Sequence, residues 1–561
     1  MKENRTFDAI VVGSGLSGGW AAKELCEKGL KVLLLERGRN VVHKEDYPTA
    51  MMEQWQLPHR GKMDMQTRQD YWVNVRTGYT ANEENRHFFT KDIDFPYNEE
   101  KPFTWVRGYQ TGGRSLMWGR QSYRWSDLDF EANAKEGIGI DWPIRYKDLA
   151  PWYSYVEKFV GISGQREGWD SLPDGEFQPA MEMNCVEREI KSRLSENLGR
   201  KITMGRIANL TQPTEEQKEL GRTSCQYRNK CMRGCPYGGY FSTQSATLPA
   251  AQRTENLTLI NDKIVFQVIF DDAKGKATGV KAIDQNTKEE VEYYGKLIFL
   301  NASAVASAWI MMQSTSATHP NGLGNESGQL GKNIMDHHKS LGVKGTFEGF
   351  EDKYYYGKRP NGIYIPRFVN IGNDKRDFLR GFGYQGGASR GAAGSKEPYG
   401  IKLKEEYSKL GPWTFSLQGF GEILPFESNH FTLSSERDKW GLPIVRFNAE
   451  LTENEYKMKQ CMVDEAINMM ESAGLKDIST YETQKSVPGI SIHEMGTARM
   501  GHEPKTSVLN AHNQVWNAPN VFVTDGAAMV SSSNVNPSLT YMALAARAVD
   551  FAVNEMKKGN L

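Results

Sequence analysis

Several features that would place a protein in a particular class are missing from this sequence. It contains no run of about 18 apolar residues that could span a bilayer, and its mean hydropathy is −0.60. Its 69 basic residues are balanced by 69 acidic ones, so charge does not favour nucleic acid or an anionic membrane surface. The first residues show neither a signal peptide nor a twin-arginine pattern. We therefore expect no transmembrane segment and no nucleic-acid partner, and export would require another protein.

Cysteine is scarce, but half of it lies in one short segment. Six cysteines in 561 residues do not make a disulfide scaffold. Three of them, Cys225, Cys231 and Cys235, fall within eleven residues. The group is compatible with a disulfide and one spare thiol, a zinc site that lacks a ligand, or an iron–sulfur cluster. The five-residue spacing and the lack of a fourth ligand are unlike structural zinc sites, whereas three thiolates and a final Cys-Pro suit an iron–sulfur cluster.

The first forty residues contain a strand, a helix and a second strand in close succession. A short apolar run at 9–12 predicts a buried parallel strand, and residues 17–28 are expected to form a helix that ends near Gly29. The run 31–35 predicts the second strand. With 561 residues, the chain is also long enough for at least two domains.

Between the first strand and the helix lies a G-x-G-x-x-G pattern. Gly13 permits a tight turn, Gly15 lets backbone amides approach a pyrophosphate, and Gly18 lets the helix pack against the strand. Glu36, at the end of the second strand, is expected to accept hydrogen bonds from the adenosine ribose. This arrangement predicts a dinucleotide site, although the motif does not distinguish FAD from NAD.

The far C-terminal part carries two further motifs. Residues 490–501 read ISIHEMGTARMG, and residues 521–524 predict a strand that runs into Asp525. Asn536 and Pro537 then open a long helix, because proline suits the first helical turn.

Together these motifs resemble the glucose–methanol–choline (GMC) oxidoreductases, FAD enzymes that oxidise alcohols. The resemblance extends over nearly the whole chain and includes the motifs at 105–108, 111–115, 330–338 and 433–445. It implies an α/β fold, α+β overall, with a Rossmann-like FAD-binding domain and an antiparallel-sheet substrate-binding domain. Residues 1–334 are expected to belong mainly to the FAD-binding domain, with a lid-like insertion at about 41–104 and a cysteine segment at about 220–240. Residues 335–485 are expected to form most of the substrate-binding domain. Residues 486–561 are expected to return to the FAD-binding domain.

The resemblance also assigns roles to individual residues. It places the catalytic base at His493, whose imidazole titrates near neutrality, and a positioning amide at Asn536. Met117 stands where some members attach FAD through a histidine, so noncovalent FAD is expected. His337, His338 and His502 are expected to be structural. The residues expected to bind the cofactor are Gly13, Gly15, Gly18, Glu36, Arg37, Gly112, Gly113, Ser115, Asp525 and Gly526.

Two stretches bear on the substrate. Gln418 and Glu422 alternate on one face of a predicted strand, where they could bind a polyol or simply face solvent. Sugar-oxidising GMC enzymes carry a glutamine and an acid at similar positions. The glycine-rich stretch 381–394 is expected to be a mobile loop.

Within the family, the large subunits of bacterial FAD-dependent glucose and glucoside 3-dehydrogenases carry C-x5-C-x3-C at the matching place, where they bind a 3Fe-4S cluster. The resemblance therefore implies that Cys225, Cys231 and Cys235 hold such a cluster. It implies a sugar dehydrogenase that oxidises a secondary hydroxyl, by preference C3 of glucosides, with hydride transfer to flavin N5. Electrons would leave through the cluster to a c-type cytochrome or another redox acceptor.

The same relatives pair with a small subunit that bears a twin-arginine signal, so a periplasmic location is expected with such a partner and a cytoplasmic one without it. The alternatives are a glucose C1 dehydrogenase, a GMC oxidase that uses oxygen, and a non-enzymatic flavin-binding module. The presence of both His493 and Asn536 argues against the last of these.

Overall fold

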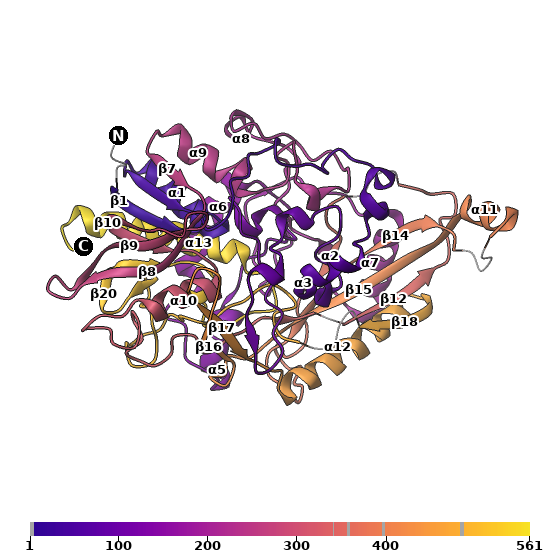
Figure 1. Ribbon diagram of the computed structural model, residues 1–561. Helices are drawn as coiled ribbons and strands as arrows, with labels where there is room; N and C mark the ends of the chain where they lie inside the picture. Colours follow the sequence, from indigo (N-terminus) through magenta and orange to yellow (C-terminus); the bar gives the residue numbers. More distant parts are fainter. Residues whose placement is uncertain (1–4, 340, 356–358, 395–398, 483–486) are drawn as a thin grey trace.

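The computed structural model describes residues 5–339, 341–355, 359–394, 399–482 and 487–561. Two large sheets lie at opposite ends of an elongated molecule (Figure 1). The apolar runs recognised in the sequence form the strands of the first sheet, and alternating strands form the second. Short helices and loops fill the space between the two sheets.

The centre of the first sheet is parallel, as the continuous apolar runs predict. Its strands follow the order β20, β10, β1, β2 and β7. β9 pairs antiparallel with β10 and with β8, and β19 pairs with β20. The bounds are β1 Thr6–Val12, β2 Val32–Leu35, β7 Leu257–Ile260, β8 Lys263–Asp271, β9 Lys276–Asp284, β10 Glu290–Leu300, β19 Gln514–Val515 and β20 Ala518–Val523.

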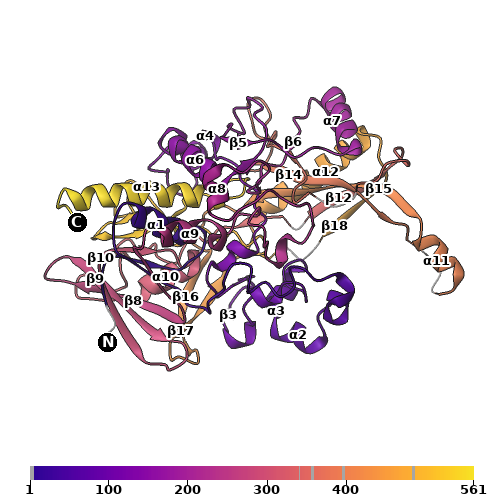
Figure 2. The same cartoon turned by 90° about the horizontal axis from the view of Figure 1, so that it is seen from above.

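Helices cover this sheet and bury its strands. Helix α1 (Leu16–Glu27) packs against both α13 (Ser538–Lys557) and α9 (Thr247–Arg253), and α13 also contacts α6 (Tyr146–Val160) (Figure 2). Helix α10 (Ala304–Gln313) lies against β8. The first and last parts of the chain therefore meet in one layer, which brings the glycine-rich turn close to the C-terminal motifs.

The second sheet is antiparallel and runs in the order β18, β12, β15, β14, β13 and β6, with β11 added to β15. Helix α12 (Glu453–Ser472) packs on one face of it, against β12 and β15. The other face carries the polar side chains discussed below. The bounds are β6 Thr203–Met204, β11 His337–His338, β12 Leu341–Phe347, β13 Ile363–Ile365, β14 Phe382–Ala392, β15 Leu410–Glu422 and β18 Lys476–Glu482.

Two details differ from the sequence-based expectation. β6, together with α7 (Cys185–Leu198), contributes to the second sheet and its core although both precede residue 334. The glycine-rich stretch 381–394 is mostly strand β14 rather than a loop, because its glycines admit close backbone approach: a Cβ at Gly386 would lie 2.3 Å from the carbonyl oxygen of Ser416.

The region 41–104 consists mainly of short helices and turns. Its one short strand, β3, pairs with β17 in a small three-stranded sheet with β16. Across the described ranges, no helix combines the length and apolarity needed to cross a membrane. The remaining bounds are α2 Met65–Asp70, α3 Trp72–Thr77, β3 Asn98–Glu99, α4 Asp127–Phe130, α5 Ala132–Glu136, β4 Ile162–Ser163, β5 Phe177–Gln178, α8 Glu215–Glu219, α11 Ile401–Tyr407, β16 His430–Arg437 and β17 Pro443–Asn448.

Candidate active site

The turn between β1 and α1 has the geometry of a dinucleotide cradle. Gly13 has a φ of +93°, and a Cβ there would lie 2.5 Å from the carbonyl oxygen of Asn301. A Cβ on Gly18 would lie 1.9 Å from the carbonyl oxygen of Gly13, so the helix can approach the turn only with glycine here. A Cβ on Gly15, in contrast, would meet no atom of the described residues within 4 Å. The space above Gly15, at the N-terminus of α1, suits a pyrophosphate.

Glu36 closes the adenosine side of the cradle. Its carboxylate accepts hydrogen bonds from the backbone N–H of Ser14 (3.1 Å), the Ser14 hydroxyl (2.5 Å) and the N–H of Gly38 (2.9 Å). Burial raises the pKa of Glu36. The Ser14 hydroxyl also accepts from the N–H of Gly112 (2.8 Å), and the Cα of Gly15 is the nearest atom to a Cβ built on Gly113. The two predicted phosphate-side loops therefore lie together, with the acid at their edge.

The remaining predicted cofactor residues occupy different environments. Arg37 lies over the rings of Tyr109, Phe95 and Trp440, at 4.4, 5.2 and 5.5 Å from their centres. Its role toward the cofactor stays a prediction. The Ser115 hydroxyl accepts a hydrogen bond from the N–H of Thr243 (3.1 Å).

Asp525 links the cradle to the C-terminal motifs. Its carboxylate accepts hydrogen bonds from the N–H of Ser303 (3.0 Å), the Ser307 hydroxyl (2.5 Å) and the N–H of Ala527 (2.9 Å). Burial raises the pKa of Asp525 to about 6. Gly526 passes so close to the His493 loop that a Cβ would lie 2.3 Å from the carbonyl oxygen of Glu494.

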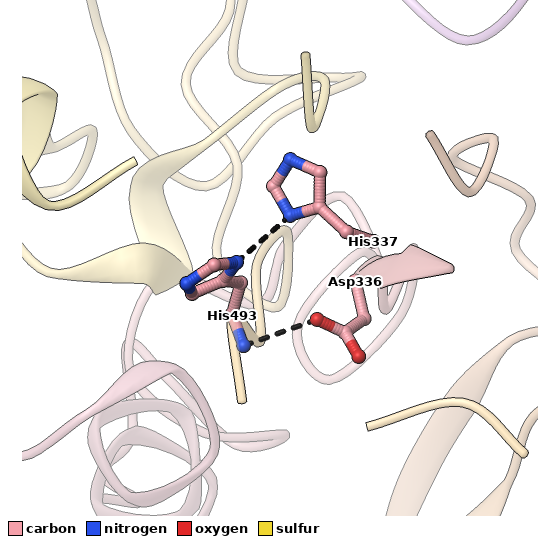
Figure 3. A group of neighbouring side chains, drawn as sticks. All are labelled: Asp336, His337 and His493. Carbon is pink, nitrogen blue, oxygen red and sulfur yellow. Dashed lines mark hydrogen bonds between the residues drawn. The ribbon is translucent and has the colours of Figure 1, made fainter. Parts of the chain in front are cut away.

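The loop that carries His493 is held against β11 by Asp336 and Ser491. The Asp336 carboxylate accepts from the backbone N–H groups of His493 (3.0 Å) and Ser491 (2.9 Å). The Ser491 hydroxyl donates to the carbonyl oxygen of His337 (2.6 Å). The Nδ1 atoms of His493 and His337 are 3.0 Å apart, so the two rings form a pair (Figure 3). His337 was expected to be structural only, but its ring contacts the predicted base.

Burial controls the electrostatics of this pair. It lowers the pKa of His493 well below its usual value, and positive charge on His337, Lys339 and Arg114 acts in the same direction. Burial also lowers the pKa of His337 to about 3. Both imidazoles are therefore neutral near pH 7, and His493 is able to accept a proton. Burial, followed by the charge of Glu494, raises the pKa of Asp336 to about 7.

Asn536 is buried at the entrance to α13 and faces strand β14. Its Oδ1 accepts a hydrogen bond from Nε2 of Gln385 (2.7 Å). Gln385 is the cross-strand partner of Gln418, whose own Nε2 donates to the carbonyl oxygen of Lys339 (2.8 Å). The sequence did not indicate a role for Gln385, because this residue lies in the glycine-rich stretch that was expected to be a loop.

Glu422 is the cross-strand partner of His337, but its surroundings are those of a buried ionic group. Its carboxylate lies 3.6 Å from Nε of Arg380 and 4.0 Å from a guanidinium nitrogen of Arg367. Burial raises its pKa to about 7, and the charge of Arg380 opposes this shift. Its expected contact with a polyol stays a prediction.

Lys339 and Tyr79, which the sequence did not single out, also border the site. The Lys339 ammonium lies 4.0 Å from the centre of the Tyr79 ring and 5.8 Å from that of Phe420. The Tyr79 hydroxyl donates to the carbonyl oxygen of Ile490 (2.5 Å), so the region 41–104 reaches the His493 loop. Burial lowers the pKa of Lys339 to about 8.

Replacing Lys339 with methionine is expected to move the acid limb of flavin reduction toward higher pH. The base must be neutral to act, and the charge of Lys339 lowers the pKa of His493, so removing that charge raises it. The limb is measured by anaerobic stopped-flow reduction from about pH 4 to pH 9. Lys332→Met serves as control, because this lysine pairs with Glu427 instead. An acid limb that stays in place or moves to lower pH contradicts the argument.

The other two histidines of the family motifs lie away from this pair. Nε2 of His338 is 3.2 Å from the sulfur of Met458, in the core beneath α12. His502 is exposed, with Nε2 3.3 Å from a carboxylate oxygen of Asp141.

Cys225, Cys231 and Cys235 lie in one half-buried loop. All six cysteines are within the described ranges, and each is free of a disulfide, so the disulfide interpretation has no support here. Burial raises the pKa of Cys225, and negative charge on Cys231 or Cys235 raises it further. The three thiols are therefore within electrostatic range of one another.

Two arginines border this loop. Arg120 lies 4.5 Å from the centre of the Tyr240 ring, and its charge lowers the pKa of Cys225. Arg222 is fully buried; burial lowers its pKa to about 9, and negative charge on Cys235 opposes this. Cations at both ends of the loop suit a group of thiolates, which need compensating charge when removed from water. These residues therefore fit a thiolate-ligated cluster.

The cysteine loop is also connected to the flavin-side run 112–118. The carbonyl oxygen of Trp118 accepts hydrogen bonds from Nη1 of Arg120 (2.9 Å) and the Tyr240 hydroxyl (3.2 Å). Trp118 directly follows Met117, which occupies the position of the covalent histidine in some members of the resembled family. The structure thus links the cysteine loop to the run expected to contact the flavin.

The parallel sheet, the glycine cradle with its terminal acid, and the half-buried imidazole define a dinucleotide-binding oxidoreductase. Profiles of the GMC oxidoreductase family match residues 7–339 and 425–545. The chain belongs to this family: it is an FAD-dependent oxidoreductase that acts on CH–OH groups. The fold class predicted from the sequence is confirmed.

Individual relatives agree with this assignment. The chain is 30% identical to 2-methyl-1,2-propanediol dehydrogenase of Mycolicibacterium austroafricanum, over 97% of this chain and 94% of the relative. It is 24% identical to the fructose dehydrogenase large subunit of Gluconobacter japonicus, over 99% of each. A solved structure of formate oxidase from Aspergillus oryzae, determined to study FAD modification, matches with a TM-score of 0.63 at 13% identity over 100% of both chains, which shows the fold alone.

Proposed function

We propose that this chain is the catalytic subunit of a sugar dehydrogenase that oxidises a secondary hydroxyl, by preference C3 of glucosides or glucose-type sugars to the 3-keto sugar. The observation that carries the proposal is the neutral His493 imidazole. The amide of Asn536, whose Oδ1 accepts a hydrogen bond from Gln385, supports it. The fructose and gluconate substrates named for two relatives support a polyol.

The chain's own residues divide the work at the substrate hydroxyl. His493 takes the hydroxyl proton, because its imidazole is neutral at working pH. Asn536 uses its Oδ1 to accept from Gln385, so its NH₂ group is left to donate to the same hydroxyl oxygen. When bound, FAD supplies the two-electron acceptor, at flavin N5, for the hydrogen that leaves carbon. A noncovalent FAD agrees with Met117, which cannot form the histidyl link.

The electron route is the finer part of the proposal. Cys225, Cys231 and Cys235 would hold a 3Fe-4S cluster, which would supply one-electron transfer out of the protein. The acceptor is then a c-type cytochrome or another redox protein. The family relative named as a large subunit supports a partner subunit. A small subunit with a twin-arginine signal would take the complex to the periplasm; without it the chain would act in the cytoplasm.

The product of sugar oxidation tests this function. Purified enzyme is incubated anaerobically with an artificial dye and either glucose or methyl glucoside, and the keto position is assigned by NMR. We expect 3-keto products from both sugars, because a C3 hydroxyl is present in each. Lactone from glucose and no product from methyl glucoside, whose C1 is blocked, would favour the C1 alternative. Rapid peroxide formation in air without dye would favour an oxidase.

A further inference from the structure

The His337 and His493 rings meet edge to face, with their centres 4.9 Å apart and their planes at 83° (Figure 3). Their Nδ1 atoms are 3.0 Å apart. A contact this short between two nitrogens requires one proton between them, since two bare lone pairs repel each other. A neutral imidazole carries a single N–H, so one ring donates through Nδ1 and the other accepts. Two arrangements of the protons are therefore available to the pair.

Only one arrangement leaves His493 able to act as a base. If His337 donates, then Nδ1 of His493 is the acceptor and its single hydrogen sits on Nε2, which then cannot take a proton. If His493 donates, its Nε2 carries the lone pair. His493 is half-buried, and within the described residues its Nε2 makes no hydrogen bond and is not closed off by protein. Nε2 is thus the atom available to a substrate hydroxyl.

Nε2 of His337 leaves the productive arrangement open. This ring is fully buried, and its Nε2 makes no hydrogen bond among the described residues. Either ring nitrogen of His337 can therefore carry its hydrogen, and the chemistry required of His493 selects Nε2. With its hydrogen on Nε2, His337 presents a bare Nδ1 to His493.

We propose that His337 is a positioning residue: it accepts the Nδ1–H of His493, holds the base with its Nε2 lone pair toward the substrate, and stabilises the imidazolium that forms when the proton is taken. This rests on the proposed function of His493 as the base. Two side chains hold the main chain of both histidines in place. The Ser491 hydroxyl donates to the carbonyl oxygen of His337, and the Asp336 carboxylate accepts from the backbone N–H of His493.

Two polar variants separate this role from a structural one. His337→Asn places an amide oxygen near the former Nδ1, where it can accept from His493. His337→Gln extends one bond further and places its polar atoms near the former Nε2. We expect anaerobic flavin reduction to fall by less than about tenfold in H337N and by about 100-fold or more in H337Q. The acid limb of the rate is expected to move to lower pH in H337Q and to return toward wild type in H337N, since only the latter stabilises the imidazolium.

Equal rates in the two variants, or a faster H337Q, would overturn the proposal. FAD content and the thermal midpoint are measured for both. If H337Q does not bind FAD, H337N alone decides, and a loss above about 100-fold rejects the proposal. His493→Ala is measured in parallel: if that variant keeps its rate, the base assignment itself fails, whereas a dead H493A with unaffected His337 variants refutes only the positioning role.

Discussion

Replacing His493 with alanine is expected to stop reduction of bound FAD by the sugar while the protein stays folded and yellow. The half-buried imidazole is neutral near pH 7 and is the group available to take the hydroxyl proton. Removing a positioned general base costs about 10²- to 10⁴-fold in rate. FAD should remain bound, because the cradle formed by Gly13, Gly15 and Gly18 and the acid Glu36 does not include the imidazole. Anaerobic stopped-flow at about 450 nm gives the rate, and the absorbance spectrum gives the FAD content.

The matched control is His502→Ala. His502 lies nine residues further along the chain and is exposed, with Nε2 of its ring 3.3 Å from a carboxylate oxygen of Asp141. It should reduce flavin at the wild-type rate. A H493A variant that retains turnover would refute the base assignment, and one that loses FAD would show that the loop of His493 supports the cofactor as well as the chemistry.

The parts of this site that could be predicted from the sequence are those in which the signal is local. The G-x-G-x-x-G turn, its flanking strands and Glu36 lie within thirty residues, and each glycine has a steric reason that depends on its immediate neighbours. The opening of α13 after Asn536 follows in the same way from proline at a helix start. His493 and Asn536 were assigned through the family resemblance. The structure pairs His493 with His337 and Asn536 with Gln385, and their roles toward the substrate stay predictions.

The residues that were missed depend on the register between distant strands. Gln385 faces the site because it pairs with Gln418, and His337 does so because β11 pairs with Glu422 at the end of β15. One residue of slip would turn either side chain to the opposite face of the sheet, and periodicity within a single strand does not determine register. The glycines of β14 also led to the prediction of a mobile loop in place of a strand. In the structure the same glycines allow the backbone of β14 to lie close to its neighbours.

Glu422 illustrates a related limit. Alternation placed it correctly on the same face as Gln418, but the residues that define its environment, Arg367 and Arg380, lie some forty to fifty-five positions earlier in the sequence. Removing Arg367 or Arg380 is expected to destabilise the end of β15, since it leaves the buried carboxylate of Glu422 with less charge compensation. Strand alternation therefore predicted the direction of the side chain without its chemical surroundings.

Replacing Cys231 with serine is expected to separate the two halves of the reaction. A serine hydroxyl is not a thiolate ligand, so the variant should lose iron, acid-labile sulfide and the electron paramagnetic resonance signal of a 3Fe-4S centre. Sugar-driven flavin reduction should stay within about threefold of wild type, because Cys231 belongs to the short turn Cys231–Arg233, not to the His493 loop. Steady-state transfer to a cytochrome should fall by about tenfold or more.

Cys461→Ser is the control for this experiment. Cys461 lies on α12, is partly buried against the core of the second sheet, and its Sγ is 3.6 Å from Nη1 of Arg376. It should keep iron content and turnover unchanged. If the anaerobically purified wild-type protein contains no iron and forms peroxide rapidly in air, the cluster proposal is wrong and the chain is a GMC oxidase. If iron is present but C231S still reduces cytochrome at the wild-type rate, the cluster is structural and electrons leave the flavin by another route.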